Sequence, residues 1–76
     1  MIILNPKNFY KEITQRDKAA FVHFYSEEHK DDDWEEMEGR FKSVVFLGSF
    51  NCDEEENWNY AKELGVEKLP SIRVFP

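Results

Sequence analysis

Cys52 is the single cysteine of this 76-residue sequence, and its thiol is the first candidate for covalent chemistry. One thiol excludes an internal disulfide, a Cys-x-x-Cys redox pair and a cysteine-based zinc site within the chain. No lysine or histidine neighbours Cys52 in the sequence to lower the pKa of its thiol. Because it stands at the end of an apolar stretch, we expect a buried structural residue. The alternative is a monothiol redox protein that uses Cys52.

The segment "EEHKDDD", residues 27–33, contains a second group of side chains that could do chemistry. His29 and the carboxylates of Asp31 to Asp33 offer ligands for a divalent cation, and hard cations require several oxygens. However, the segment lacks the glycine and the alternating spacing of a calcium loop. We therefore expect a solvated loop and helix cap with no metal or other cofactor. An acidic module that responds to divalent cations is kept as an alternative.

The charge distribution restricts the classes of partner. The net charge is -6, most of it from acidic clusters at residues 31–38 and 53–56, and no cluster of lysine or arginine offsets them. Nucleic-acid binding is therefore not expected. No apolar run approaches the roughly 18 residues that a membrane span needs. The first residues also lack the basic start and long apolar region of a signal peptide.

Short apolar stretches alternate with helical patterns along the chain, which is typical of a βαβ protein. The length corresponds to one domain, and seven Phe, three Tyr and two Trp residues provide an aromatic core. The stretch 19–25 is almost continuously apolar, which predicts a central strand covered on both faces. The expected strands are residues 2–4, 19–25, 43–51 and 71–75, and helical patterns occupy residues 5–14, 31–41 and 53–64. His23 within the central strand is expected to be a buried residue with its hydrogen bonds satisfied.

Polar residues before each helical pattern predict where the helices begin. Asn5 precedes a proline at the expected first helical position, and Asp33 and Asp53 each have a glutamate three residues later. Gly65 is expected to end the third helix. The predicted buried stripes are Trp34, Met37 and Phe41 in the second helix and Trp58, Ala61 and Leu64 in the third.

Two segments together resemble the thioredoxin fold, and most closely the domains of protein disulfide isomerases. "FVHFYS" is similar to the strand that leads into the redox motif of that family, and "NCDEEENWNYAKELGVEKLPSIRVFP" is similar to the region that ends in its cis-proline strand. The resemblance covers nearly the whole chain. It implies one three-layer α/β/α domain over residues 1–76, in the order β-α-β-α-β-α-β, that is incomplete at its C-terminus. The matching residues are Phe24, Tyr25, Ser26, Ala61, Leu64, Gly65, Val66, Pro70 and Ser71.

The resemblance also implies how the chain differs from a redox protein. It implies that the Leu69–Pro70 peptide bond is cis and that main-chain groups of Leu69 can bind an extended peptide. Where the family has Trp-Cys-x-x-Cys, this chain has "EEHKDDD", and the buried acidic residue of the family falls at His23. Thiol–disulfide exchange requires an attacking thiolate. We therefore expect no redox catalysis, no catalytic residues and no enzymatic activity.

In the family, a further strand and a helix follow the cis-proline strand, whereas this sequence ends at Pro76. The resemblance thus predicts an open edge at residues 71–75 and an uncovered sheet face that carries either Ile72 and Val74 or Phe75. We expect an interaction or scaffold module within a larger protein or complex, or a module that self-associates. The endoplasmic reticulum lumen is favoured, with the cytoplasm as the alternative. The expected partner-binding residues are Leu69, Pro70, Ser71, Ile72, Val74 and Phe75.

Overall fold

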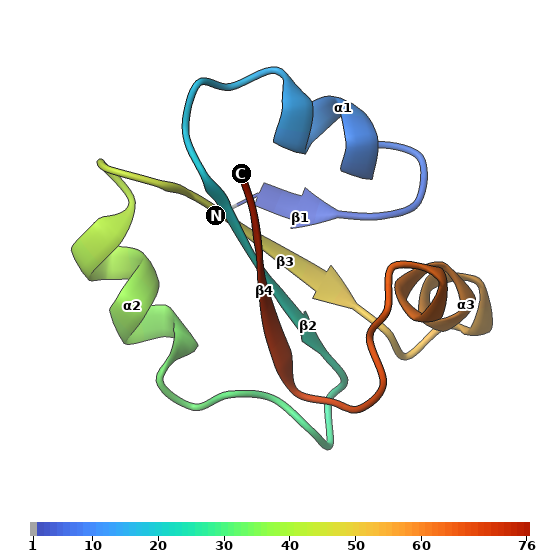
Figure 1. The fold of residues 1–76 in the computed structure, drawn as a ribbon. Helices are drawn as coiled ribbons and strands as arrows, with labels where there is room; N and C mark the ends of the chain where they lie inside the picture. The colour runs from blue at the N-terminus through green and yellow to red at the C-terminus, as the bar shows by residue number, and fades with distance from the viewer. Residues whose placement is uncertain (1) are drawn as a thin grey trace.

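Strands and helices alternate along the chain in the computed structural model, which describes residues 2–76. The elements are β1 (Ile2–Leu4), α1 (Phe9–Thr14), β2 (Ala20–Tyr25), α2 (Trp34–Phe41), β3 (Phe46–Asn51), α3 (Glu55–Glu63) and β4 (Ser71–Phe75). Figure 1 shows β2, β3 and β4 crossing the middle of the molecule, with helices on both sides. The predicted order β-α-β-α-β-α-β is confirmed.

The four strands form one mixed sheet in the order β1-β3-β2-β4. β1 and β2 each run parallel to β3, which lies between them, and β4 runs antiparallel to β2. β2 thus lies inside the sheet, as its apolar sequence predicts, because a strand of this composition needs cover on both faces. In the register, His23 of β2 lies opposite Ser49 of β3 and Ile72 of β4, so these three side chains share one face.

The sheet is covered by α1 and α3 on one face and by α2 on the other (Figure 1). Phe9 of α1 packs against the rings of Phe24 and Phe50, with ring centroids 6.3 and 5.9 Å apart, and Tyr60 of α3 stacks on Phe50 at 5.8 Å. These aromatic contacts form the centre of the core. The predicted three-layer α/β/α architecture is therefore confirmed.

Two helices begin later than their capping residues predicted. α1 starts at Phe9 after Asn8, and Asn5 caps the turn that leads into it: its side chain accepts the N–H groups of Lys7 and Asn8, and its carbonyl accepts that of Phe9. α3 starts after Glu54, because the Asp53 carboxylate accepts the N–H of Glu27 instead of capping the helix. Asx side chains offer the backbone such alternatives to a helix.

α2 follows Asp33, as predicted, although the Asp33 side chain makes no capping hydrogen bond. Its buried stripe is shorter than expected. Trp34 is buried and Met37 is partly buried, but Phe41 is 44% exposed. The stripe prediction was therefore wrong at Phe41, which is the last residue of α2.

α3 ends at Glu63, and Gly65 terminates it, as the sequence predicts. Gly65 has a φ of 96°, its N–H donates to the Lys62 carbonyl, and the N–H of Val66 donates to the Ala61 carbonyl. These two bonds are those of a Schellman motif, which requires a left-handed residue after the helix. Val66 is buried just beyond it, so the chain turns into the segment that leads to β4.

Candidate functional site

β4 is an edge strand that contains most of the predicted partner-binding residues, and the other two, Leu69 and Pro70, directly precede it. The Leu69–Pro70 peptide bond before it is cis, as predicted. β4 pairs with β2 on one side, and among residues 2–76 no strand pairs with its other side. An unpaired row of main-chain N–H and C=O groups is a template for an added strand.

The side chains of β4 divide between the two faces of the sheet. Phe75 points to the face of α1 and α3, where its ring packs edge-on against Phe9 at 5.4 Å, so it is partly buried against the core. Ile72 and Val74 lie on the face of α2, and Val74 is 54% exposed. The exposed apolar surface at β4 is therefore that of Ile72 and Val74.

A cavity of about 320 Å³ opens on the face of α2, at the carboxyl ends of β2 and β3. The carboxyl ends of parallel strands are the usual position of ligand sites in α/β sheets. The cavity combines aromatic rings with acidic side chains from the loop after β2 and the first turn of α2. Its lining residues are His23, Tyr25, Glu27, Lys30, Asp31, Asp32, Trp34, Glu35 and Ser49.

Three rings form the inner wall of this cavity. His23 stacks on Tyr25 at 5.1 Å and lies against Trp34 at 5.0 Å. The indole N–H of Trp34 donates to Ser49 Oγ at 3.1 Å, which fixes the first turn of α2 on β3. Nε2 of His23 accepts the main-chain N–H of Asp31 at 3.0 Å, which fixes the loop. Because both anchors are buried or half-buried, we expect the cavity to be preformed.

The hydrogen bond to Nε2 also indicates which tautomer neutral His23 adopts. An imidazole nitrogen that accepts a hydrogen bond carries no proton, so neutral His23 has its proton on Nδ1. Burial lowers the pKa of His23, and the carboxylate of Asp31 opposes this effect less strongly. The imidazole at the position that the resemblance gives to an acidic residue is therefore neutral and buried, and the expected hydrogen bond is present at Nε2.

Cys52 lies directly after β3 in the core. It is 6% exposed, its N–H donates to the Tyr25 carbonyl, and its thiol lies 3.8 Å from the Phe50 carbonyl. Burial raises the pKa of the Cys52 thiol to about 11, and the nearby Asp53 carboxylate acts in the same direction. The protonated thiol, unlike the thiolate, is a poor nucleophile. The environment of Cys52 is thus that of a structural residue.

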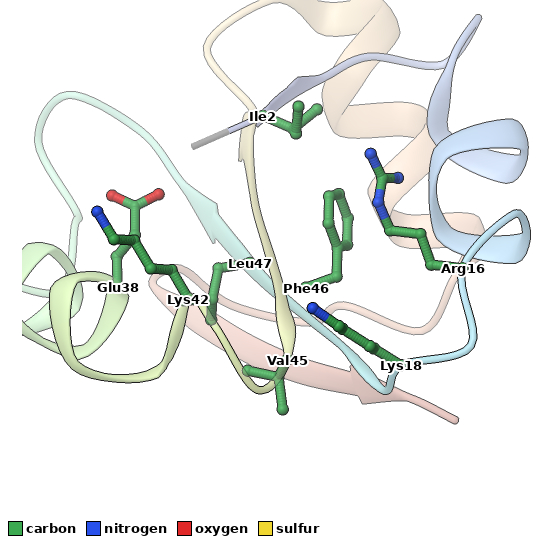
Figure 2. A pocket seen from close by; sticks show the side chains of 8 residues that line it. All are labelled: Ile2, Arg16, Lys18, Glu38, Lys42, Val45, Phe46 and Leu47. Carbon is green, nitrogen blue, oxygen red and sulfur yellow. The ribbon is translucent and has the colours of Figure 1, made fainter.

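A second cavity of about 180 Å³ lies at the opposite end of the parallel strands, and Figure 2 shows its lining. Arg16 and Lys18 lie on one side of β3, and Glu38 and Lys42 lie on the other, at α2. Arg16 is occupied, since its guanidinium stacks over the Phe46 ring at 4.3 Å and pairs with Glu12 at 3.0 Å. Lys18 is exposed and makes a long hydrogen bond to the Ser43 carbonyl. Both basic side chains on this side of β3 therefore have partners within the chain.

The acidic loop does not gather metal ligands. Within residues 2–76, no group of three His, Cys, Asp or Glu side chains could hold a metal ion. His29 is exposed, and its main chain pairs with Ser26 in a small turn. In the same part of the chain, none of the helices has the length and apolar character that a membrane crossing requires.

Comparison with solved structures identifies the architecture. The chain superposes on the J-Trx1 fragment of ERdj5 with a TM-score of 0.78, at 22% identity, over 97% of this chain and 36% of that one. Thioredoxin f from spinach chloroplast gives a TM-score of 0.78 at 21% identity, over 97% of this chain and 70% of that one. The fold is thioredoxin-like. Thioredoxin f2 of Chlamydomonas reinhardtii agrees, with a TM-score of 0.74 at 19% identity, over 99% of this chain and 74% of that one.

The sequence of this thioredoxin-like chain is similar to protein disulfide-isomerase A6. It is 29% identical to the protein from Mus musculus and 28% identical to that from Homo sapiens, over 99% of this chain. The chain spans 18% of the length of these relatives. No family model matches it. The similarity to isomerase sequences and the single cysteine agree with the resemblance read from the residues.

The thioredoxin-like chain contains a site that the sequence analysis did not predict. Trp34 was assigned to a buried stripe, and Ser49 was not considered. The available signal was the alternation of β2, because Phe21, His23 and Tyr25 must share one face of the strand. That alternation places the imidazole of His23 and the phenol of Tyr25 side by side, whereas a strand face that packs in a core usually carries only apolar side chains. The acidic loop that completes the cavity is brought there by the fold.

Proposed function

We propose that this chain is a redox-inactive thioredoxin-like module that binds an extended segment of a partner polypeptide along β4. The observation that carries the proposal is the open outer edge of β4, next to the exposed Val74 and the partly buried Ile72. An added strand would pair with the main chain of β4 and cover these two side chains. Leu69, Pro70 and Ser71 would contact the end of that strand.

The chemistry of the cysteine supports an interaction role over a catalytic one. The chain has one cysteine, so a disulfide cannot form and exchange within it. The Cys52 thiol is buried and has a raised pKa, and it follows β3, which β2 separates from the open edge at β4. The similarity to protein disulfide-isomerase A6 favours the endoplasmic reticulum lumen as the location, with the cytoplasm as the alternative.

Substitution of Val74 by lysine tests the proposal. A charge on an edge strand opposes strand addition. We expect the unmodified chain to bind a hydrophobic dye and to associate during sedimentation, because its apolar edge is open, and we expect Val74→Lys to reduce both. The matched control is Ile3→Lys, because Ile3 is 68% exposed and lies on the same sheet face at the opposite edge.

Two results would contradict the proposal. The first is a wild-type chain that stays monomeric and binds no hydrophobic dye, because the edge of β4 would then be stable without a partner. The second is an equal loss of binding in Ile3→Lys and Val74→Lys, since the effect would then come from charge in general. A dimer that dissociates in Val74→Lys alone would identify a second copy of the chain as the occupant of the edge.

A further inference from the structure

The aromatic cavity beside β4 has an excess of negative charge. Glu27 pairs with Lys30 at 3.2 Å, whereas Asp31, Asp32 and Glu35 have no ion-pair partner among residues 2–76. The first turn of α2 contributes about half a positive charge to the same region. About 2.5 negative charges remain unbalanced. A concave site with one sign of charge concentrates ions of the other sign.

The inner wall of the cavity also has unused hydrogen-bonding capacity. His23 is 3% exposed and lines the cavity, and its Nδ1 has no hydrogen-bond partner within residues 2–76. The wall beside it consists of the rings of Tyr25 and Trp34, and aromatic faces attract cations. A planar guanidinium can lie on such rings while it donates to carboxylates. One water molecule could accept from both His23 Nδ1 and the guanidinium.

The cavity is within reach of a strand added to β4. His23 lies opposite Ile72 in the register, so the cavity and the side chain of Ile72 share one face. An added strand would lie two strand spacings from β2, or roughly 10 Å. From that strand, the aliphatic part of a long basic side chain would pack over Ile72, and its charged end would enter the cavity.

We propose that the cavity formed by Tyr25, His23, Trp34 and the carboxylates of Asp31, Asp32 and Glu35 receives an arginine side chain from the polypeptide that pairs with β4. This inference rests on the proposed function and specifies the chemistry of the partner. The partner is an extended segment in which an arginine shares a face with apolar residues. Such a segment complements both the apolar surface of β4 and the acidic cavity.

Two capped peptides test the inference on the intact chain. One has the sequence Thr-Val-Thr-Arg-Thr-Val-Thr, and the other has citrulline, the uncharged analogue, in place of arginine. Titration is followed by two-dimensional NMR of the ¹⁵N-labelled protein. The amide signals of Ile72 and Val74 report strand addition, and the Trp34 indole and Asp31 amide signals report the cavity. We expect both peptides to move the β4 signals, and the arginine peptide to bind at least tenfold more tightly and to move the cavity signals.

Matched charge variants separate the cavity from the overall charge. Asp32→Asn/Glu35→Gln removes two exposed carboxylates at the cavity, whereas Glu55→Gln/Glu56→Gln removes two at α3. We expect the first variant to bind both peptides equally, and the second to keep the preference for arginine. Equal affinity of the wild type for both peptides, with the β4 signals moved, would overturn the arginine site and leave the proposed function standing. If neither peptide moves the β4 signals, the proposed function and the inference that rests on it both fail.

Discussion

Gly65 is the residue at which local backbone conformation most clearly determines the fold. Its φ of 96° lies in the left-handed region, and the turn that it forms directs the chain from α3 toward β4. The Arg73 side chain crosses back and donates to the Gly65 carbonyl, so the turn is also bonded to β4. A Cβ atom at this position would lie 3.6 Å from the Arg73 guanidinium, which is an ordinary contact. A side chain at this position would therefore destabilise the protein through its backbone conformation and not through a steric clash.

We predict that Gly65→Ala lowers the free energy of unfolding by about 1 to 2 kcal/mol, because a left-handed conformation costs a residue with a Cβ atom that amount. The control is Gly39→Ala within α2, where the added Cβ atom would meet nothing within 4 Å. Alanine at an exposed helical glycine should instead stabilise the protein by up to about 1 kcal/mol. Urea unfolding measures both changes, and changes of the same sign would contradict the assignment of Gly65.

His23 is the residue from which we predict a pH dependence of stability. Burial lowers its pKa in the folded state below the ordinary value of 6.5, so the unfolded chain binds a proton more readily. Stability from this residue is therefore complete above pH 6.5 and decreases as the pH falls toward the folded pKa. Asp31, which faces the ring, reduces the shift, and the other charged groups around the cavity are Glu27, Lys30, Asp32 and Glu35.

Urea unfolding at pH 7.5 and at pH 5 measures this dependence. Between pH 7.5 and pH 5, we expect His29→Gln, at an exposed position, to lose as much free energy of unfolding as the wild type. We expect His23→Gln to lose less. The comparison is made within each variant, so the lower overall stability of His23→Gln does not affect it. An unchanged pH dependence in His23→Gln would show that other groups cause it.

At the scale of elements, α2 is fixed to the sheet mainly through its first turn. Trp34 is 3% exposed, packs on His23 and donates to Ser49, whereas Phe41 at the other end of α2 is 44% exposed. α3 is held differently, since Ala61 is fully buried and Trp58 is only partly buried. The two tryptophans are therefore unequal in their contribution to the packing of their helices.

We predict that Trp34→Phe lowers the free energy of unfolding by about 1 to 3 kcal/mol, through the lost hydrogen bond to Ser49 and the volume of the missing ring. Trp58→Phe, at a partly buried position next to Lys62, should cost clearly less. Both variants keep an aromatic residue at the same helical position. Urea unfolding compares them, and a larger loss for Trp58→Phe would contradict the assignment of Trp34 as the anchor of α2.

At the scale of the whole molecule, Cys52 reports the opening of the core. The thiol is buried beneath the helical layer formed by α1 and α3, so a reagent reaches it when the protein opens. We predict that the native protein reacts with an aromatic disulfide reagent at pH 8 at least 100-fold more slowly than the protein in urea. Ser43→Cys, at an exposed position, provides a thiol that should react at once. Equally fast reaction of native Cys52 would favour the monothiol alternative.

Much of the fold could be predicted from local sequence, because the strands and helices of this chain follow from patterns among residues close together in the sequence. The alternation of "SIRVF" defined the two faces of β4, the apolar run of β2 placed it inside the sheet, and Gly65 defined the end of α3. The starts of α1 and α3 were missed, because Asn5 caps a turn just before α1, and the Asp53 carboxylate accepts the N–H of Glu27 instead of capping α3. Such competition between partners cannot be judged from spacing alone.

The sequence by itself determined that the chain lacks a thiol pair and alternates strands with helices. The tertiary structure decided which face of β4 is exposed, because that depends on which helix covers each side of the sheet: Phe75 meets Phe9 in the core, and Val74 stays open. It also decided the cavity. His23 and Ser49 lie far apart in the sequence and become neighbours only through the register of β2 and β3, and the acidic loop joins them through the bond from Asp31 to His23.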